Sequence, residues 1–541
     1  MKHLSGLDNL FLTLDQGNQY MHVGGVGVYD PSSAPGGKVR FKSILNFFAN
    51  RLNQAKIFRR RLVMAPLGLD RPYWIEDGEI DIEYHVRHIA LPHPGDWRQL
   101  MIQVARIHSR PLDMTKPLWE AYIIEGLNNI PGISPDSFAM YTKFHHSAVD
   151  GEAGAELIRA IHTLTPELDE ASGGTDGAAM TIVADREPTA AELYARAVGN
   201  RTQQALQATK LFASLGGRLA SAGGEFIVSG KALELGRHYA ARWLGREVSS
   251  PEESEQARSS TGIKPHTRFD GEVTAHRVVE AVGFPLADCK KIRQHIAGAT
   301  INDIFMAAVG GALRNYLEGK NELPERSLNA MVPMTTRGQD KGIDAGTDSG
   351  IDSGNHIGMT ALPLRTDIAD PLERLRAVSR GNNKGKAVSA ALGKDLPAQL
   401  VNVLPASLAA KLLVSGLTSL ANVTVSNVRG PDVPLYMAGA QLQLFLPVSI
   451  PMTGLGLNIT GFSYNGTLWV CFVSCRQMIA DPGVFAQCLN EAFEELVGAA
   501  VATGPRAGTY AAAAKAHQVS ATSKRAPVKR KAKRSKPSGA T

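Results

Sequence analysis

The sequence predicts an α/β protein of two domains, and three observations support this. Its 541 residues are too many for one ordinary hydrophobic core. The content of hydrophobic residues is 44% and that of charged residues 20%, as in soluble globular proteins. Short runs with strand-like alternation are interleaved with segments of helical periodicity, both before and after an Ala-rich stretch near the middle of the chain.

The first half of the chain divides into two stretches. In residues 1–164, the patterns predict strands at 21–30, 80–91 and 118–127 and an amphipathic helix at 41–52. In residues 165–263, a loop rich in Gly and Asp is followed by helix-favouring segments at 190–222 and 231–245. We interpret this second stretch as a helical linker, either packed or lying on an anionic lipid surface.

The second half also divides into two stretches. Residues 264–503 alternate again, with strands predicted at 329–338, 354–364, 422–431 and 466–475 and helices at 301–317 and 370–386. Residues 504–541 are basic and lack an apolar period, so we expect a disordered tail.

The positive charge belongs to that tail. It holds ten Lys and Arg and no acidic residue, and without these ten the 58 basic residues fall to 48, against 51 acidic ones.

The four scattered cysteines are too few for a disulfide framework and indicate reduced thiols in a cytoplasmic protein. We expect neither a signal peptide nor a membrane span, because no window reaches ~18 uncharged apolar residues.

Two adjacent histidines stand out in "FAMYTKFHHSAVDG". If this segment is a strand, His146 shares a face with the mostly apolar set Phe138, Met140, Thr142 and Phe144, and His145 lies on the other face. We therefore expect His146 to point inward. Asp150 falls at the following turn, where its carboxylate can bind backbone amides or a cation.

An imidazole in this position suits acid–base chemistry. Its ordinary pKa of about 6.5 lets it accept a proton near neutral pH, for example from a hydroxyl that attacks an acyl group. Taken alone, however, a pair of histidines is more often a hydrogen-bonded pair with no catalytic role.

The whole motif changes this balance. "HHSAVDG" matches HHxxxDG and resembles the CoA-dependent acyltransferase superfamily, which includes chloramphenicol acetyltransferase-like enzymes and peptide synthetase condensation domains. More closely, the chain resembles the bacterial wax ester synthase/diacylglycerol O-acyltransferases. The resemblance covers about the first 500 residues apart from the linker, through "LSGLDNLFL", "MHVGGVGVYD", "RPLDMTKPLWEAYIIEGL", "TINDIFMAAVGGALR", "VSNVRGP" and "GLGLNITGFSYNGTLWVCFVSC". It implies two chloramphenicol acetyltransferase-like subdomains with mixed sheets, joined by a helical linker.

The resemblance also implies roles for the residues of the motif. His146 would be the general base that takes the proton of an alcohol as its oxygen attacks a fatty acyl-CoA thioester. His145 and Asp150 would position the base, and Gly151 would permit the turn. The resemblance implies direct transfer, with no acyl-enzyme intermediate.

Two further elements of the family map onto this sequence. Asn302 and Asp303 match its ND element, and Asn302 could bind the oxyanion or the acceptor hydroxyl from the inward stripe of a helix. The alternative is a pair that caps the helix N-terminus. Pro117, Leu118 and Trp119 match the PLW element and are expected to shape the substrate channel. "VRGP" has Arg429 where relatives often carry Pro, and "FRRRL" at Phe58 could meet CoA phosphates or form a solvated helix face.

The resemblance also implies the substrates and the location. The donor would be acyl-CoA, used as a substrate with no cofactor or metal, and the acceptor diacylglycerol or a long-chain alcohol. The basic tail could hold the protein peripherally on a membrane or lipid inclusion, could bind nucleic acid, or could serve solubility alone. Two rival functions remain at this point: a same-fold acyltransferase with a carrier-protein donor or a polyketide or peptide acceptor, and a non-catalytic lipid-inclusion protein.

Overall fold

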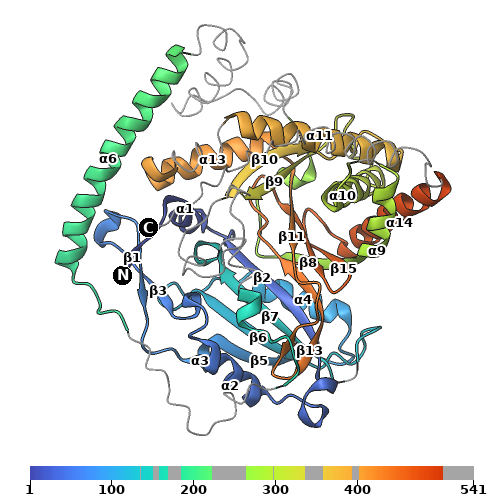
Figure 1. The fold of residues 1–541 in the computed structure, drawn as a ribbon, viewed down its shortest axis with the longest axis horizontal. Coiled ribbons are helices and arrows are strands. Elements are labelled where there is room, and N and C mark those ends of the chain that lie inside the picture. The colour runs from blue at the N-terminus through green and yellow to red at the C-terminus, as the bar shows by residue number, and fades with distance from the viewer. Residues whose placement is uncertain are drawn as a thin grey trace, which may run out of the picture.

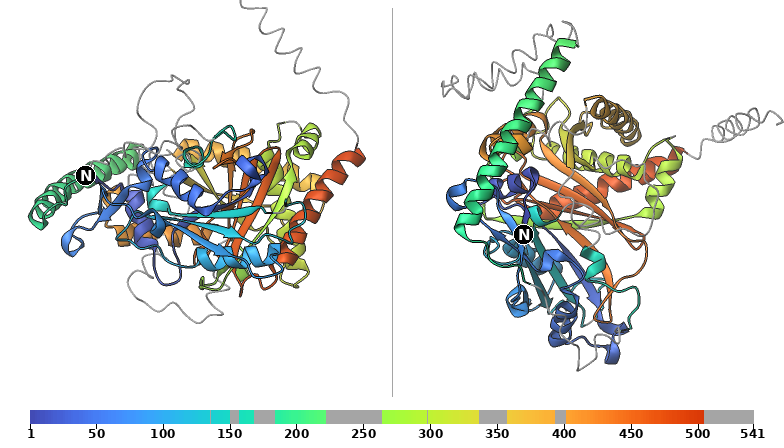
Figure 2. Two further views of the ribbon diagram at one scale, coloured as in Figure 1. Left: turned by 90° about the horizontal axis from the view of Figure 1, so that it is seen from below. Right: turned by 60° about the vertical axis from the view of Figure 1, so that its left-hand side comes forward.

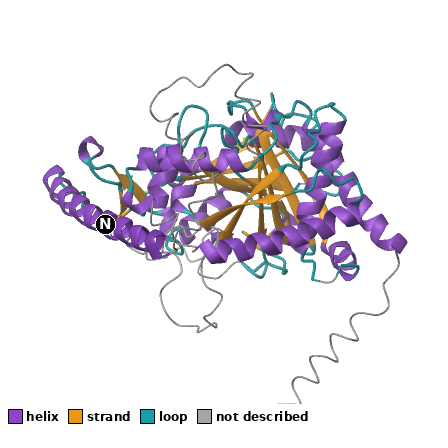
Figure 3. Cartoon of the chain, turned by 90° about the horizontal axis from the view of Figure 1, so that it is seen from above, coloured by secondary structure: helices purple, strands orange, loops and turns teal. Residues whose placement is uncertain are grey.

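The structure is a computed structural model that describes residues 1–134, 136–149, 157–167, 184–221, 264–296, 298–335, 357–392 and 401–503. Within these residues the chain forms two six-stranded mixed sheets and a small three-stranded sheet (Figure 1). Helices lie outside the strands (Figure 3).

The first sheet has the strand order β12-β13-β2-β7-β6-β5. Its strands are β2 (His22–Asp30), β5 (Val86–Ala90), β6 (Trp119–Glu125), β7 (Phe138–His145), β12 (Tyr436–Met437) and β13 (Ala440–Val448). Only the β5–β6 pair is parallel. Helices α2 (Phe41–Arg51) and α4 (Trp97–His108) contribute to the cores on its two faces.

Two strands of this sheet come from the distant second half of the chain. β13 pairs antiparallel with β2, with Phe445 opposite Gly27 and Val448 opposite Gly24. A Cβ on Gly25 would lie 2.1 Å from the Phe445 ring, so this glycine permits the close packing of the two strands. The second half is therefore not a separate body, since residues 436–448 complete the sheet that carries the histidine motif.

The second sheet has the order β10-β9-β11-β14-β15-β8. Its strands are β8 (Arg277–Pro285), β9 (Asn329–Thr335), β10 (Ile357–Pro363), β11 (Val423–Arg429), β14 (Leu457–Tyr464) and β15 (Thr467–Cys475). One large apolar core joins it to the helices α9 (Leu286–Gln294), α10 (Ile301–Glu318), α11 (Pro371–Leu392) and α14 (Pro482–Thr503). α10 is almost fully buried from Asp303 to Leu313, which explains its apolar composition.

The remaining elements lie near the N-terminus. The third sheet consists of β1 (Lys2–His3), β4 (Tyr73–Glu76) and β3 (Arg60–Val63). Helix α1 (Gly6–Leu14) packs through Leu10 and Leu14 against α13 (Ala406–Leu420). Helix α6 (Ala190–Ser221) runs along the outside of the molecule (Figure 2).

The predicted elements at 21–30, 41–52, 118–127, 301–317, 329–338, 354–364, 370–386, 422–431 and 466–475 are confirmed. The strand expected at 80–91 is wrong in its first half. There Asp81 accepts hydrogen bonds from the backbone amides of Glu83 and Tyr84 and caps the short helix α3 (Ile82–His85) before β5 begins. The helix predicted at 190–222 is confirmed as α6, whereas the helix at 231–245 and the basic tail lie outside the described residues.

A further expectation concerned the basic run after Phe58. This run follows a 3₁₀ turn (Lys56–Phe58) and leads into β3, so it is not a helix face. Arg59 pairs with Glu76 at 2.7 Å and Arg61 pairs with Asp77 at 3.5 Å beside the small sheet. No helix among the described residues is long and apolar enough to cross a bilayer.

Candidate active site

The histidine motif begins where β7 ends. Two backbone hydrogen bonds fix this point: the amide of His145 donates to the carbonyl of Leu118 at 3.0 Å, and the amide of His146 donates to the carbonyl of Met21 at 2.7 Å. Residues 146–148 then form a 3₁₀ turn, η5 (His146–Ala148). The two histidines thus belong to different elements, and their side chains are in different surroundings.

His145 is fully buried and both of its ring nitrogens are engaged. Nδ1 accepts the backbone amide of Ser147 at 3.1 Å and lies 2.7 Å from the Ser147 hydroxyl. Because an amide can only donate, Nδ1 accepts and carries no proton, and the hydrogen of the ring sits on Nε2. Nε2 lies 3.2 Å from Oδ2 of Asp15, which accepts this hydrogen. With its one lone pair occupied, His145 has no site left to take a proton from a substrate.

His146 is less buried than its neighbour. Its ring stacks on Phe11 of α1, with centroids 4.1 Å apart and an interplanar angle of 23°. Strand alternation does not decide the direction of the His146 side chain, because β7 stops at His145. The expectation that one face of this strand is the inner one is wrong, since all eight residues of β7 are buried, with the α2 core on one face and the α4 core on the other.

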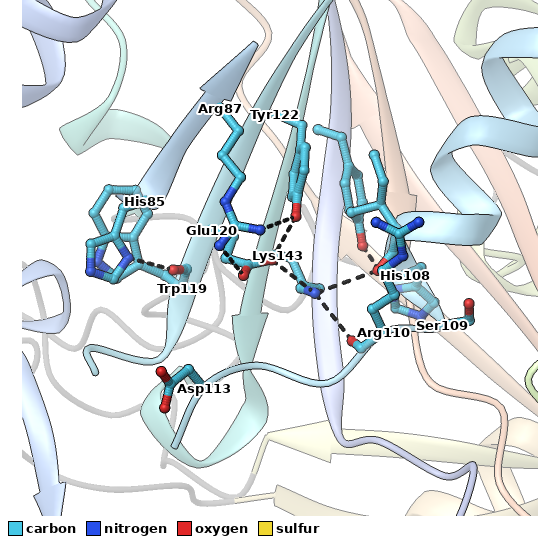
Figure 4. Close-up of polar contacts among 12 residues, drawn as sticks. His85, Arg87, His108, Ser109, Arg110, Asp113, Trp119, Glu120, Tyr122 and Lys143 are labelled. Atoms are coloured by element: carbon cyan, nitrogen blue, oxygen red, sulfur yellow. Dashed lines mark hydrogen bonds and ion pairs between the residues drawn. The ribbon is translucent and has the colours of Figure 1, made fainter. Parts of the chain in front are cut away.

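A network of buried charged residues contacts β7 at Lys143, two residues before His145 (Figure 4). Lys143 is fully buried and pairs with Glu120 of β6 at 3.0 Å, and Glu120 also pairs with Arg87 of β5 at 3.1 Å. The Lys143 ammonium donates to the carbonyl of Arg110 at 3.1 Å, just beyond α4. Burial is the largest influence on Lys143 and lowers its pKa, against the opposing effect of the Glu120 carboxylate.

Two more buried histidines lie on the same side of the sheet. His108 accepts from the Tyr141 hydroxyl at 2.8 Å and donates to the carbonyl of Ser449 at 3.0 Å, so it links α4, β7 and the segment after β13. Burial lowers the pKa of His108 to about 3. His22, directly opposite His145 in the β2–β7 register, is fully buried with its ring 5.8 Å from that of His145, and burial holds its pKa well below the ordinary value.

The ND pair lies at the N-terminus of α10, and its two residues do different things. Asp303 forms a capping box with Thr300 and accepts a hydrogen bond from Asn382 of α11 at 2.6 Å. Asn302 is half-buried, and its amide oxygen accepts from Asn427 of β11 at 3.3 Å. Asp303 is thus a capping residue, as the alternative interpretation has it, whereas Asn302 lies where α10 meets the end of β11.

The PLW residues support the strand that carries the motif. The carbonyl of Leu118 holds the backbone of His145, and Trp119 lies in the core between His85 and Phe48, with its ring 4.5 Å from that of His85. The Trp119 indole donates to the carbonyl of Phe58 at 3.2 Å. All three residues, Pro117 included, are buried. Asp150 and Gly151 lie outside the described residues.

Sequence reasoning missed Phe11 of α1 and Asp15, the residue that caps this helix, which contact the two histidines of the motif. They are four positions apart in "LFLTLDQ", a spacing that places both on one side of a helix end. That spacing could have been noticed. Their partners are about 130 positions away along the chain, however, and the local pattern carries no signal of that contact.

Solved structures define the class of fold. The first condensation domain of the calcium-dependent antibiotic synthetase matches with a TM-score of 0.51 over 94% of this chain and 98% of that one, at 15% identity. The wax ester synthase/diacylglycerol acyltransferase from Marinobacter aquaeolei VT8 matches with a TM-score of 0.60 over 92% of this chain and 100% of that one, at 26% identity. The protein is therefore a two-subdomain α/β protein of the acyltransferase and condensation-domain type.

Sequence comparisons narrow this class to one family. Residues 4–305 match the wax ester synthase/diacylglycerol acyltransferase catalytic domain, and residues 353–497 match the C-terminal domain of the same family. The chain is 32% identical to a Mycobacterium tuberculosis protein named as a diacylglycerol O-acyltransferase, over 93% of this chain and 100% of that protein. It is also 32% identical to the O-acyltransferase WSD of Acinetobacter baylyi, over 88% of this chain and 93% of that one. The chain belongs to the wax ester synthase/diacylglycerol acyltransferase family.

Proposed function

We propose that this protein transfers a long-chain fatty acyl group from acyl-CoA to the hydroxyl of diacylglycerol or of a long-chain alcohol. The products would be triacylglycerol or a wax ester, together with CoA. Family membership over most of the chain supports the reaction class. The observation that carries the mechanism is that both ring nitrogens of His145 are engaged by Asp15 and Ser147. We therefore assign the role of the base to His146.

The chemistry then needs only the residues of the chain. His146 accepts the hydroxyl proton as the alcohol oxygen attacks the thioester carbonyl. The C–O bond forms, and negative charge develops on the carbonyl oxygen of the tetrahedral intermediate. Collapse of the intermediate breaks the C–S bond, and the imidazolium returns the proton to the departing CoA thiolate. The Asn302 amide is the side chain we assign to the developing oxyanion, since a preorganised donor there can be worth about 10²–10³ in rate.

The same proposal includes association with lipid, because both substrates carry long apolar chains. The eight Lys and Arg between Lys524 and Lys536 could each contribute about 1 kcal/mol near an anionic surface. Flotation of the full chain and of a variant truncated after Gly504 with phosphatidylserine vesicles, at low and high salt, tests this part. A DNA-retention arm with the same two proteins tests the nucleic acid alternative.

The reaction itself is tested with a panel of donors and acceptors. Labelled palmitoyl-CoA is offered with dipalmitoylglycerol and with hexadecanol in turn, and both ester formation and CoA release are followed. Palmitoyl attached to an acyl carrier protein serves as the competing donor. Ester formation from palmitoyl-CoA supports the proposal, whereas transfer from the carrier protein alone, or no transfer from either donor, contradicts it.

A further inference from the structure

The contact between Asp15 and His145 joins the end of α1 to the catalytic motif. Asp15 is the C-terminal cap residue of α1, and its two carboxylate oxygens accept separate hydrogen bonds. Oδ1 accepts from the backbone amide of Met21, and Oδ2 accepts from Nε2 of His145. Met21 is also the residue whose carbonyl receives the amide of His146, so Asp15 reaches both histidines through short connections.

Helix α1 is itself held firmly. Leu10 and Leu14 are buried against Ala409 and Ala410 of α13. The backbone amide of Gly6 donates to the side chain of Asn402 at 2.9 Å. From this anchored helix, Phe11 lies against the ring of His146 while Asp15 holds His145. One helix thus contacts both members of the pair.

Resting on the function proposed above, we propose that Asp15 is a positioning residue of this acyltransferase. It fixes the Nε2–H form of His145, which leaves Nδ1 free to accept the amide of Ser147 and so sets the 3₁₀ turn that presents His146. The other ionisable groups near His145 do not compete with Asp15 for its Nε2 hydrogen. On its own strand, Lys143 is paired with Glu120, and His22 across the register is held neutral by burial.

An Asp15→Asn substitution isolates this role because the two side chains have the same shape. Met21 and His145 meet different oxygens of Asp15, and an asparagine has an oxygen in only one of these two places, so it cannot accept from both. If its nitrogen faces His145, that ring must move its proton to Nδ1, and the amide of Ser147 loses its acceptor. If its nitrogen faces Met21, the amide group of the asparagine and the backbone amide of Met21 are two donors without an acceptor between them, which disfavours this orientation. Asp70→Asn is the matched control, since Asp70 is equally an acceptor of side-chain hydrogen bonds, from Tyr73 and Asn200, but lies at the small sheet.

The kinetic test compares wild type, Asp15→Asn, His145→Ala and the double variant with palmitoyl-CoA and a saturating acceptor. We expect Asp15→Asn to lower kcat about 10- to 100-fold with KM little changed, below the roughly 10²–10⁴-fold contribution of a general base. Because Asp15 acts through His145, the double variant should be no slower than His145→Ala alone. Additive losses, or an Asp15→Asn rate within twofold of Asp70→Asn, would overturn the inference.

A second readout does not depend on turnover. In ¹⁵N-histidine NMR spectra of the wild type, the signal that His145→Ala removes should have the shifts of an Nε2–H imidazole. In Asp15→Asn this signal should move toward the Nδ1–H form, while Asp70→Asn leaves it in place. A wild-type His145 in the Nδ1–H form contradicts the inference whether or not ester is made. Absence of ester from a wild type with the Nε2–H signal contradicts the proposed function instead.

Discussion

The Asp15 carboxylate lies 3.2 Å from Nε2 of His145, a residue 130 positions further along the chain. This contact occupies the Nε2 side of the ring, while the backbone amide of Ser147 occupies the Nδ1 side. His145 therefore belongs to the framework around the motif. His146 stacks on Phe11 and is the residue that we propose as the base.

The buried pair of Lys143 and Glu120 predicts a large stability effect. Glu120→Gln leaves the Lys143 ammonium in the protein interior without its carboxylate, and we expect a loss of about 3–5 kcal/mol in the free energy of unfolding. Urea denaturation followed by circular dichroism measures it.

The double variant Glu120→Gln with Lys143→Met is the companion measurement. It removes the unpaired charge along with the acid, so it should recover a large part of the loss. Equal stability of the single and double variants would show that desolvation of Lys143 is not the cause.

The buried histidines predict how stability depends on pH. Burial lowers the pKa of His108 to about 3 and that of His162 to about 4, and it also lowers the pKa values of His22 and His85. In the unfolded chain these rings bind a proton below about pH 6.5, so unfolding takes up protons there. The stability they confer is therefore complete above that pH and is lost as the pH falls toward 4.

The size of this effect is at most about 1.4 kcal/mol per pH unit for each such histidine. Thermal unfolding of wild type and His108→Gln between pH 7.5 and 5 measures it, since glutamine keeps a donor and an acceptor but cannot titrate. We expect the variant to lose less stability over this range than the wild type. Parallel curves would contradict the assignment of His108 as a buried neutral ring.

The glycines of β2 predict a steric effect next to the motif. A Cβ on Gly24 would lie 2.0 Å from the carbonyl oxygen of Thr142 in β7, and backbone cannot move aside as a flexible side chain can. Gly24→Ala should therefore separate the two strands and give insoluble or unfolded protein. Gly199→Ala, in α6 with nothing within 4 Å, should instead raise stability by up to about 1 kcal/mol. Soluble expression and melting temperature distinguish the two, and a normally stable Gly24→Ala protein would contradict the packing described for β2 and β7.

The ND pair predicts a separation of stability from rate. Asp303→Ala removes a capping box and the acceptor of Asn382, so we expect a loss of about 1–2 kcal/mol in stability. Asn302→Ala should leave stability nearly unchanged and lower kcat about 10²–10³-fold, if its amide meets the oxyanion. A fully active Asn302→Ala enzyme would remove this residue from the mechanism.

Local patterns located the motif and many of the elements, but they did not predict α4, α9, α13, α14, β8, β13 or β14. Period-two runs located β2, β6, β9, β11 and β15, and helical periodicity located α2, α10 and α11. They failed at residues 82–85, where the Asp81 cap overrides a strand-like alternation. Alternation also says nothing about which face is inner when helices cover both sides, as they do at β7.

Long-range contacts account for what the sequence did not show. Three such contacts join segments whose local patterns do not indicate a partner. They are the pairing of β13 with β2, the ion pair of Lys143 with Glu120, and the contact of Asp15 at the end of α1 with His145. Phe11 and Asp15 occupy positions that suit a helix in any α/β protein. Their role follows only from where the fold places β7.

In the proposed mechanism, His146 takes the proton from the acceptor hydroxyl. The decisive measurement is of labelled ester formed from palmitoyl-CoA and either dipalmitoylglycerol or hexadecanol, with wild type and with folded His146→Ala protein. We predict ester from the wild type and a rate at least about 10²-fold lower from the variant, with its melting temperature retained. An unchanged rate of ester formation by His146→Ala would contradict the account.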